Sequence, residues 1–325
     1  MIDPLCLWSL KTVELDLRAP LIMAILNATP DSFSDGGRFA DQVSERFQVD
    51  VERVVAAANE AVRAGADILD VGGESTRPGS DPVGEAEELR RAIPVVRALK
   101  ERVGAPISVD TYRPAVAAEA LDAGAEIVND VSAGRFIGEP DRFAAEDEDF
   151  PEEMAEVVAS RGAGVVLCHM RGKPKTMQTE GLDPDRDLVW EARSFLSDRM
   201  LRMRERGVPF RKMAVDPGLG FGATFEQNWD LMVNVDQIVM FPPVPIVVGA
   251  SRKSFIKEAL RRFGEDLSLE PGTLLDPSNK DALDFATALT SVFASRRLPR
   301  ILRVHNVAAT SFALSAANAF EKSPD

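Results

Sequence analysis

Eight short apolar segments recur along the chain, and each is followed by a longer segment whose apolar residues have helical spacing. The apolar segments run over residues 21–27, 66–73, 106–111, 126–131, 164–170, 212–218, 245–250 and 300–306. They are almost continuously apolar, which is typical of parallel strands that are buried on both faces. Eight strand–helix units in 325 residues predict a single-domain α/β protein, a (β/α)8 TIM barrel.

A doubly wound open sheet is the alternative architecture, but eight evenly spaced units favour closure into a barrel. We expect the barrel to span residues 21–325 and residues 1–20 to form an N-terminal extension that covers the barrel floor. Two irregular segments interrupt the repeat: the acidic segment 136–153 and the segment 265–280, which contains two prolines. We interpret both as excursions or surface loops without function.

Composition excludes several classes of protein. With 2 cysteines and 2 histidines, the chain cannot build a disulfide framework, a Cys-rich zinc site or a multi-His metal centre. A formal net charge of −14 and an isoelectric point near 4.8 argue against nucleic acid and membrane as partners, because anionic phosphates attract basic surfaces. The short apolar runs and an N-terminus without a basic segment predict a cytoplasmic protein with no membrane span.

Polar and charged residues follow all eight apolar segments, and the carboxyl ends of barrel strands meet at one rim. One group is rich in acceptors, Asp110, Asn129 and Asp216, and suits a flat heterocycle with several N–H donors. A cationic group comprises Arg77, Arg252, Lys253, Arg303 and His305. Several of these follow the last two strands, where barrels often bind phosphate, and Ser254 should begin a helix that faces an anion. The rim therefore predicts a site for a planar nitrogen-rich ligand beside a phosphate or pyrophosphate.

One motif could be mistaken for a nucleotide site. The segment GLGFGA at 218–223 matches the pattern G-x-G-x-x-A of dinucleotide-binding turns. That pattern belongs to an early βαβ unit of a doubly wound sheet, whereas this segment lies in the sixth of eight units. We therefore do not interpret it as a dinucleotide site.

Eight segments carry a resemblance to a known family. In chain order they are LNATPDSFSDGG, DILDVGGESTRPG, ISVDT, IVNDVSAG, CHMRGKPKTMQ, VDPGLGFG, VGASRKSFI and ILRVHN. They resemble the corresponding segments of dihydropteroate synthases, pterin-binding enzymes, over essentially residues 15–320. The resemblance implies a barrel that joins p-aminobenzoate to 6-hydroxymethyl-7,8-dihydropterin pyrophosphate in folate biosynthesis, by dissociative displacement at the pterin methylene. It also implies that the protein uses Mg2+ as cofactor, forms a homodimer and is a target of sulfonamides.

The resemblance further implies roles for individual residues. The catalytic residues are Lys253, Asp110, Arg303, His305 and Asn27, and Asn27 is also the metal ligand. The pterin-binding residues are Asp110, Asn129, Val131, Cys168, Asp216, Phe221 and Lys253. The pyrophosphate-binding residues are Asn27, Thr76, Arg77, Arg303 and His305. The p-aminobenzoate-binding residues are Phe33, Thr76, Pro78, Phe221, Ser251, Arg252 and Ser254.

Three positions depart from the family pattern, and one of them is Ala28, where relatives usually carry Val. Cys168 stands where relatives usually carry Met, which should enlarge the pterin pocket slightly, and Asn306 stands where they usually carry Asp, which removes a negative charge near the pyrophosphate. Asp70 could support Asn27 or the metal from behind.

Two alternative functions remain. One is a pterin-dependent methyltransferase, which shares the barrel and the pterin-binding acids, and the other is a non-catalytic pterin-binding paralogue. SRKS and TPDSFSDGG favour the synthase over the methyltransferase. Asn27, Lys253 and Arg303 are all present, and the loss of one of them would have favoured the paralogue.

Overall fold

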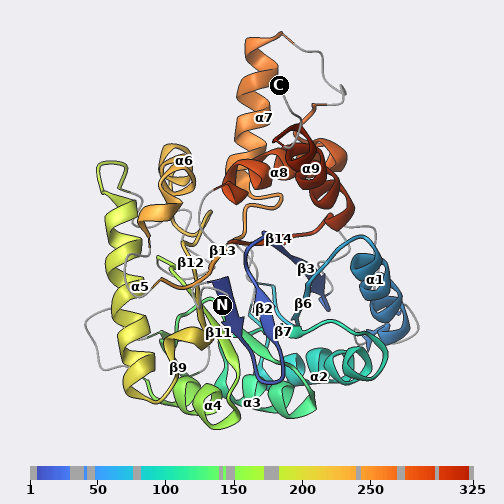
Figure 1. The fold of residues 1–325 in the computed structure, drawn as a ribbon, viewed down its shortest axis with the longest axis vertical. Coiled ribbons are helices and arrows are strands. Elements are labelled where there is room, and N and C mark those ends of the chain that lie inside the picture. The colour runs from blue at the N-terminus through green and yellow to red at the C-terminus, as the bar shows by residue number, and fades with distance from the viewer. Residues whose placement is uncertain are drawn as a thin grey trace.

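The computed structural model describes residues 6–29, 40–41, 48–75, 82–138, 142–143, 151–171, 183–238, 243–268, 275–296 and 300–321. Eight parallel strands close into a barrel in the order β11-β12-β13-β14-β3-β6-β7-β8, which confirms the predicted TIM barrel (Figure 1). The strands are β3 (Leu21–Asn27), β6 (Ile68–Gly72), β7 (Ile107–Asp110), β8 (Ile127–Asp130), β11 (Gly164–Cys168), β12 (Met213–Asp216), β13 (Ile246–Val248) and β14 (Arg300–Val304). Each strand lies within its predicted segment.

The helices surround the barrel (Figure 1). They are α1 (Val51–Arg63), α2 (Glu85–Arg102), α3 (Pro114–Ala123), α4 (Glu153–Arg161), α5 (Leu188–Glu205), α6 (Phe225–Val233), α7 (Ser254–Asp266), α8 (Lys280–Ser295) and α9 (Val307–Glu321). The described residues thus contain nine α-helices, one more than the predicted eight helical segments, because the connection from β13 to β14 holds both α7 and α8. In Figure 1, α7, α8 and α9 gather at one end of the molecule.

The core has two main layers. The larger one lies between the strands and the helices and is built from aliphatic residues of both. The second lies inside the barrel and includes Trp8, Leu10 and Leu17 of the hairpin β1 (Leu7–Ser9)–β2 (Glu14–Asp16), packed against strand residues such as Met23. Trp8 is fully buried, so the hairpin packs tightly against the barrel interior. The division of the chain at residue 20 stays a prediction.

The segment interpreted as an excursion without function contains ordered structure. Strands β9 (Phe136–Gly138) and β10 (Arg142–Phe143) pair in an antiparallel ladder. The rings of Phe136 and Phe143 lie 5.2 and 5.3 Å from that of Tyr112, just after β7. Aromatic contacts at these distances stabilise the hairpin over the carboxyl ends of the strands. A further two-stranded ladder joins β4 (Ala40–Asp41) and β5 (Gln48–Val49). Among the described helices, none is both long and apolar enough to cross a lipid bilayer.

Candidate active site

The barrel register brings the predicted polar residues to one level. Asn27 on β3 pairs with Gly72 on β6, Gly72 pairs with Asp110 on β7, and Asp110 pairs with Asn129 on β8. On the opposite side of the barrel, Cys168 on β11 pairs with Asp216 on β12. Residues that share a level in a closed parallel barrel point to the same rim, so these side chains converge as the sequence predicted.

Arg303 joins the carboxylates at the centre of the barrel. Its Nε donates to Asp70 Oδ2 at 2.6 Å, and its Nη2 donates to Asp110 Oδ2 at 2.6 Å. Asn129 donates to the same Asp70 oxygen at 3.2 Å, so Asp70 supports Arg303 and Asn129, whereas its support of Asn27 or the metal stays a prediction. Burial raises the pKa of Asp110, and the positive charge of Arg303 counteracts that rise. Charge-assisted bonds of this length hold Arg303 rigidly.

Lys253 lies beside the third buried carboxylate. Its Nζ donates to the Leu219 carbonyl and lies 4.0 Å from the centroid of the Phe221 ring. Burial lowers the pKa of the Lys253 ammonium and raises the pKa of the Asp216 carboxyl, because it disfavours the charged form of each. The opposite charges of the two groups counteract both shifts. Gly220 has a φ of +79°, and a Cβ there would lie 2.8 Å from Lys253 Cδ, so glycine makes room for the lysine.

Acidic and basic side chains therefore lie next to each other in the site, not in two separate groups. The sequence interpretation separated an acceptor-rich group from a cationic group, whereas Arg303 contacts Asp70 and Asp110, and Lys253 lies near Asp216. The physical reason is that carboxylates buried together are costly unless cations neutralise them.

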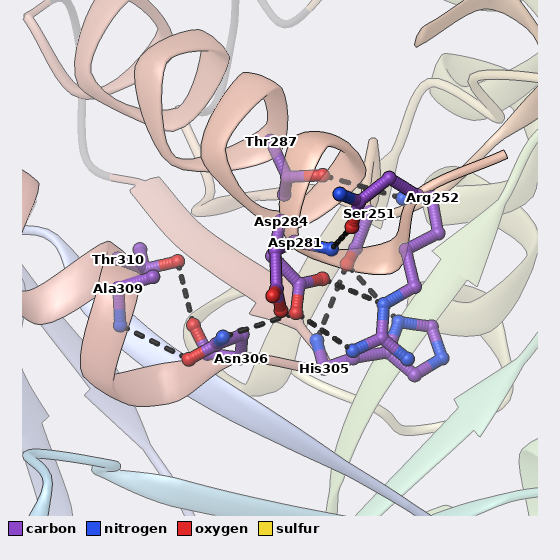
Figure 2. A network of polar contacts seen from close by, with 10 residues as sticks. Ser251, Arg252, Asp281, Asp284, Thr287, His305, Asn306, Ala309 and Thr310 are labelled. Atoms are coloured by element: carbon purple, nitrogen blue, oxygen red, sulfur yellow. Dashed lines mark hydrogen bonds and ion pairs between the residues drawn. The ribbon is translucent and has the colours of Figure 1, made fainter. Parts of the chain in front are cut away.

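Ser251 and His305 connect the segments that follow β13 and β14. The Ser251 hydroxyl oxygen accepts the backbone N–H of His305 at 3.2 Å and lies 3.0 Å from His305 Nδ1 (Figure 2). A hydroxyl has one proton and two acceptor lone pairs, so the contact with Nδ1 fits either tautomer of His305: the hydroxyl donates when Nδ1 is unprotonated and accepts when Nδ1 carries the proton. In both cases the contact fixes the orientation of the imidazole ring.

Arg252 forms an ion pair within the protein. Its guanidinium donates to both carboxylate oxygens of Asp284 on α8, at 2.6 and 3.0 Å (Figure 2). Its charge is therefore compensated within the protein, although the side chain still lines the cavity. Ser254 is the first residue of α7, as predicted, and its position exposes the helix N-terminus to the same cavity.

A cavity of about 460 Å³ brings most predicted site residues together. Those that line it are Asn27, Asp110, Phe221, Ser251, Arg252, Lys253, Ser254, Arg303 and His305. Asn129, Val131, Cys168 and Asp216 do not line it; they are buried at the barrel end below. Lys257 and Lys280, which sequence reasoning missed, add positive charge to the lining. A site that is cationic in an acidic protein suits anionic ligands.

Some predicted residues cannot be placed. Phe33, Thr76, Arg77 and Pro78 lie outside the described residues. Cys168 is buried among Val131, Met170 and Tyr112, and burial raises the pKa of its thiol well above the usual value, which agrees with a packing role.

A buried ionic cluster behind Asp110 was also missed. Arg113 Nη1 donates to Glu74 at 2.8 Å and to Glu88 at 2.5 Å, and Tyr112 donates to Glu74 at 2.6 Å. Glu74 accepts the backbone N–H of Val83 at 3.0 Å, and Arg113 Nη2 donates to the Val83 carbonyl at 2.7 Å. The cluster thus joins the chain on both sides of residues 76–81. Glu74 lies within the GGESTRPG motif, so the sequence did contain a feature that could have pointed to this cluster.

Comparison with known proteins gives consistent matches over nearly the whole chain. Residues 23–305 match the family described as pterin binding enzyme. The chain is 38% identical to a dihydropteroate synthase of Synechocystis sp., over 92% of this chain and 89% of that protein. It is similar to the crystal structure of the Yersinia pestis dihydropteroate synthase with a sulfonamide drug complex, with a TM-score of 0.78, 33% identity, and coverage of 98% of this chain and 100% of that one. It also resembles the Burkholderia cenocepacia dihydropteroate synthase complexed with 7,8-dihydropteroate, with a TM-score of 0.75, 34% identity, and coverage of 97% and 96%.

Proposed function

The chain belongs to the pterin-binding enzyme family and has the dihydropteroate synthase activity of folate biosynthesis, and from that premise we propose how its residues divide the reaction. The methyltransferase and the non-catalytic paralogue are thereby set aside. The observation that carries the division is the position of Arg303, which contacts the buried carboxylates and lines the same cavity as Asn27 and His305.

We assign the pterin to the buried end of the site. Asp110, Asn129 and Asp216 supply acceptors to the ring N–H groups, and Val131 and Cys168 form an apolar wall. Phe221 and Lys253 cover the ring near the cavity, where they contact each other. Burial raises the pKa of both carboxylates, and Arg303 beside Asp110 and Lys253 beside Asp216 counteract that rise and so favour the ionised form.

We assign the pyrophosphate to the open side of Arg303. His305 and Asn27 line the same cavity, and Ser251 fixes the orientation of the His305 ring. Thr76 and Arg77 are further proposed contacts from outside the described residues.

The described residues fit Mg2+ only if substrate and water supply most of its ligands. The described residues contain no group of three or more His, Cys, Asp or Glu side chains that could hold a metal. Asn27 offers a single amide oxygen in the cavity beside Arg303 and His305, and Mg2+ is usually held by few protein ligands together with substrate phosphates and water. Asn27 would therefore hold Mg2+ together with the pyrophosphate. The bound ion would supply positive charge that stabilises the leaving group.

We assign p-aminobenzoate to the outer part of the cavity. Phe221 offers a ring face, and Ser254 with the N-terminus of α7 receives the carboxylate. Ser251 and Arg252 shape this part of the cavity, and Phe33, Thr76 and Pro78 complete the proposed pocket from outside the described residues. A p-aminobenzoate pocket of this kind is also the proposed target of sulfonamides, since a sulfonamide complex exists for the Yersinia pestis relative.

The reaction then follows from the charges. The carbon–oxygen bond to pyrophosphate breaks, both bonding electrons leave with the oxygen, and the pterin methylene becomes cationic. Arg303 and His305 stabilise the leaving group, whereas Asp110 and Asp216 stabilise the delocalised cation. The neutral arylamine attacks the methylene and then releases a proton to solvent, so no strong base is needed. The enzyme must exclude water from the cation until the amine attacks.

The direct test is pyrophosphate release by the purified protein with dihydropterin pyrophosphate and Mg2+, with and without p-aminobenzoate. We expect release that depends on p-aminobenzoate and yields dihydropteroate, with kcat/KM at least about 10²-fold lower in Lys253→Ala. Pterin binding without product in the wild-type protein would contradict the proposed division of the reaction.

We also propose that the protein is a homodimer in the cytoplasm. Helices α6, α7 and α8 share an apolar groove of about 690 Å³. Exposed apolar residues line it: Val233, Phe263, Phe285, Leu289 and Phe293. Phe293 is 73% exposed, which is unfavourable in water and favours burial against a second copy.

A further inference from the structure

Asp284 on α8 connects two segments of the active site that come from different strands (Figure 2). Its Oδ1 and Oδ2 accept from the guanidinium of Arg252, in the segment after β13, at 2.6 and 3.0 Å. Its Oδ2 also accepts from the side-chain amide of Asn306, after β14, at 3.0 Å. Asp284 is 5% exposed, so water screens these interactions little.

The conformation of Arg252 needs such support. Its φ is 58°, in the left-handed region that residues with a side chain rarely adopt. Helix α8 holds it at two points, since Thr287 Oγ1 accepts the Arg252 backbone N–H at 3.3 Å and Asp284 accepts the guanidinium. Unfavourable backbone conformations persist where surrounding contacts determine them. The neighbours of Arg252 in the chain are Ser251 and Lys253, both of which line the cavity.

The side-chain amide of Asn306 supplies the hydrogen-bond donor that the Asp284 carboxylate accepts. Asn306 Oδ1 accepts the Ala309 backbone N–H at 3.0 Å and caps α9, while its Nδ2 donates to Asp284. An aspartate at 306 could keep the cap but would replace the donor with a second carboxylate oxygen facing Asp284. The departure noted in the sequence, Asn for the usual Asp, is therefore compatible with a carboxylate at 284.

We propose that Asp284 is a positioning residue of the active site, which holds the segment of Ser251 and Lys253 in register with the segment of His305. It touches no reacting atom in this proposal and acts through Arg252 and Asn306. The inference rests on the assignment of p-aminobenzoate and pyrophosphate to these two segments.

The test exchanges the two partner groups. Asn306→Asp places two carboxylates together, and Asp284→Asn removes the charge that binds Arg252. We expect each single variant to raise the KM for p-aminobenzoate about tenfold, the effect of losing one charge-assisted hydrogen bond. The double variant Asp284→Asn with Asn306→Asp restores one carboxylate and one amide in exchanged places. Arg252 then faces an amide, so only the contact between positions 284 and 306 is restored. We therefore expect a KM about tenfold above wild type, as for Asp284→Asn alone, instead of the roughly hundredfold rise that two independent effects would give.

Thermal unfolding is measured on all variants, because a purely structural role lowers the melting temperature without changing the KM of the folded enzyme. If Asn306→Asp does not fold, Asn306→Ser, which can still cap α9, replaces it with an expected rise in KM of about threefold. Ser291→Ala is the matched control, since its hydroxyl donates to Thr287 within α8, and its KM should be unchanged.

Single variants with the wild-type KM would overturn the role of Asp284, and so would a double variant whose KM rises roughly hundredfold, as two independent effects predict. A wild-type protein that forms no dihydropteroate would instead overturn the assignment of the substrates, so the two failures are distinguishable.

Discussion

Single residues in this barrel take their chemistry from the partners that burial gives them. Arg303, Asp70 and Asp110 would each be costly to bury alone, and together they form a compensated set with bonds of 2.6 Å. Asp216 and Lys253 have opposite charges and lie in the same buried region. The substrate therefore meets carboxylates and cations that the protein has already oriented.

The first residue-scale prediction concerns pH. Because burial raises the pKa of Asp110 and pterin binding needs its carboxylate, activity should fall as the pH drops through that raised value. The acid limb of kcat/KM should therefore lie above the usual aspartate range near 4. Asp110→Asn should lower kcat/KM by about 10²-fold at pH 8 and flatten that limb. A wild-type acid limb near pH 4 would contradict this.

The second residue-scale prediction concerns Gly218. Its φ is +77°, and an added Cβ would overlap the carbonyl oxygen of His169, a backbone atom that cannot rotate away. Gly218→Ala should lower the free energy of unfolding by at least about 3 kcal/mol, measured by urea denaturation. Gly104→Ala is the control, because no atom lies within 4 Å of a Cβ there, and its stability should be nearly unchanged. Equal stability of the two variants would refute the argument.

At the scale of elements, the cluster of Arg113, Glu74 and Glu88 joins the end of β6 to α2 and to the start of α3. Arg113 is fully buried and directly precedes Pro114, the first residue of α3. The cluster holds two carboxylates around one guanidinium, so one acid is incompletely compensated. Burial accordingly raises the pKa of Glu88 to about 7, against the attraction of Arg113.

This raised pKa predicts a pH-dependent stability. The folded protein holds the Glu88 proton more tightly than the unfolded chain, so the stabilisation is complete below pH 4.5 and is lost as the pH rises through about 7. The group accounts for a decrease of about 3 kcal/mol over that window. In Glu88→Gln the decrease should be smaller by that amount, as measured by urea unfolding from pH 5 to 8.

Glu87→Gln provides the control for this experiment. Glu87 is partly exposed, and its hydrogen bond from Arg90 lowers its pKa, so it does not titrate between pH 5 and 8. Its variant should therefore keep the wild-type pH dependence. The same slope in Glu88→Gln and in wild type would show that Glu88 does not titrate in this window.

At the scale of the whole molecule, two surfaces differ from the rest. The chain carries a formal net charge of −14, yet lysines and arginines outnumber carboxylates in the lining of the active-site cavity, which attracts anionic substrates. The apolar groove on α6, α7 and α8 lies at the end of the molecule where α7 and α8 gather (Figure 1). Among the described residues, the groove shares no lining residue with the active-site cavity.

The proposed dimer predicts that the mass in solution falls by half when the groove is disrupted. Wild type should sediment at twice the chain mass of 35.4 kDa, and Phe293→Asp should sediment as a monomer because a carboxylate cannot be buried there unpaired. Phe312→Asp is the matched control: Phe312 is 76% exposed on α9 and does not line the groove, so this variant should stay dimeric. A monomeric wild type would refute the proposal.

The sequence by itself determined the barrel, the rim and the start of α7. Eight apolar segments, each followed by a helical period, permit few other architectures, and the polar residues that end those segments lie at one rim of any such barrel. Ser254 begins α7 as predicted, although the N-cap residue Lys253 makes no side-chain capping bond; the buried residues Phe255, Ile256 and Leu260 that follow have helical spacing. These features depend on residues close together in the chain, which is why the sequence alone predicts them.

Only the tertiary structure decided how the charges pair. Arg303 and Asp70 are 233 positions apart, and Arg252, in the turn between β13 and α7, contacts Asp284 on α8, 32 positions away. The β9–β10 hairpin, interpreted from sequence as an excursion without function, packs its phenylalanines on Tyr112 beside the site. Such partners follow from which side chains the closed barrel brings within 3 Å of each other, because a buried charge must be compensated by whatever lies nearest, and spacing along the chain does not contain that information.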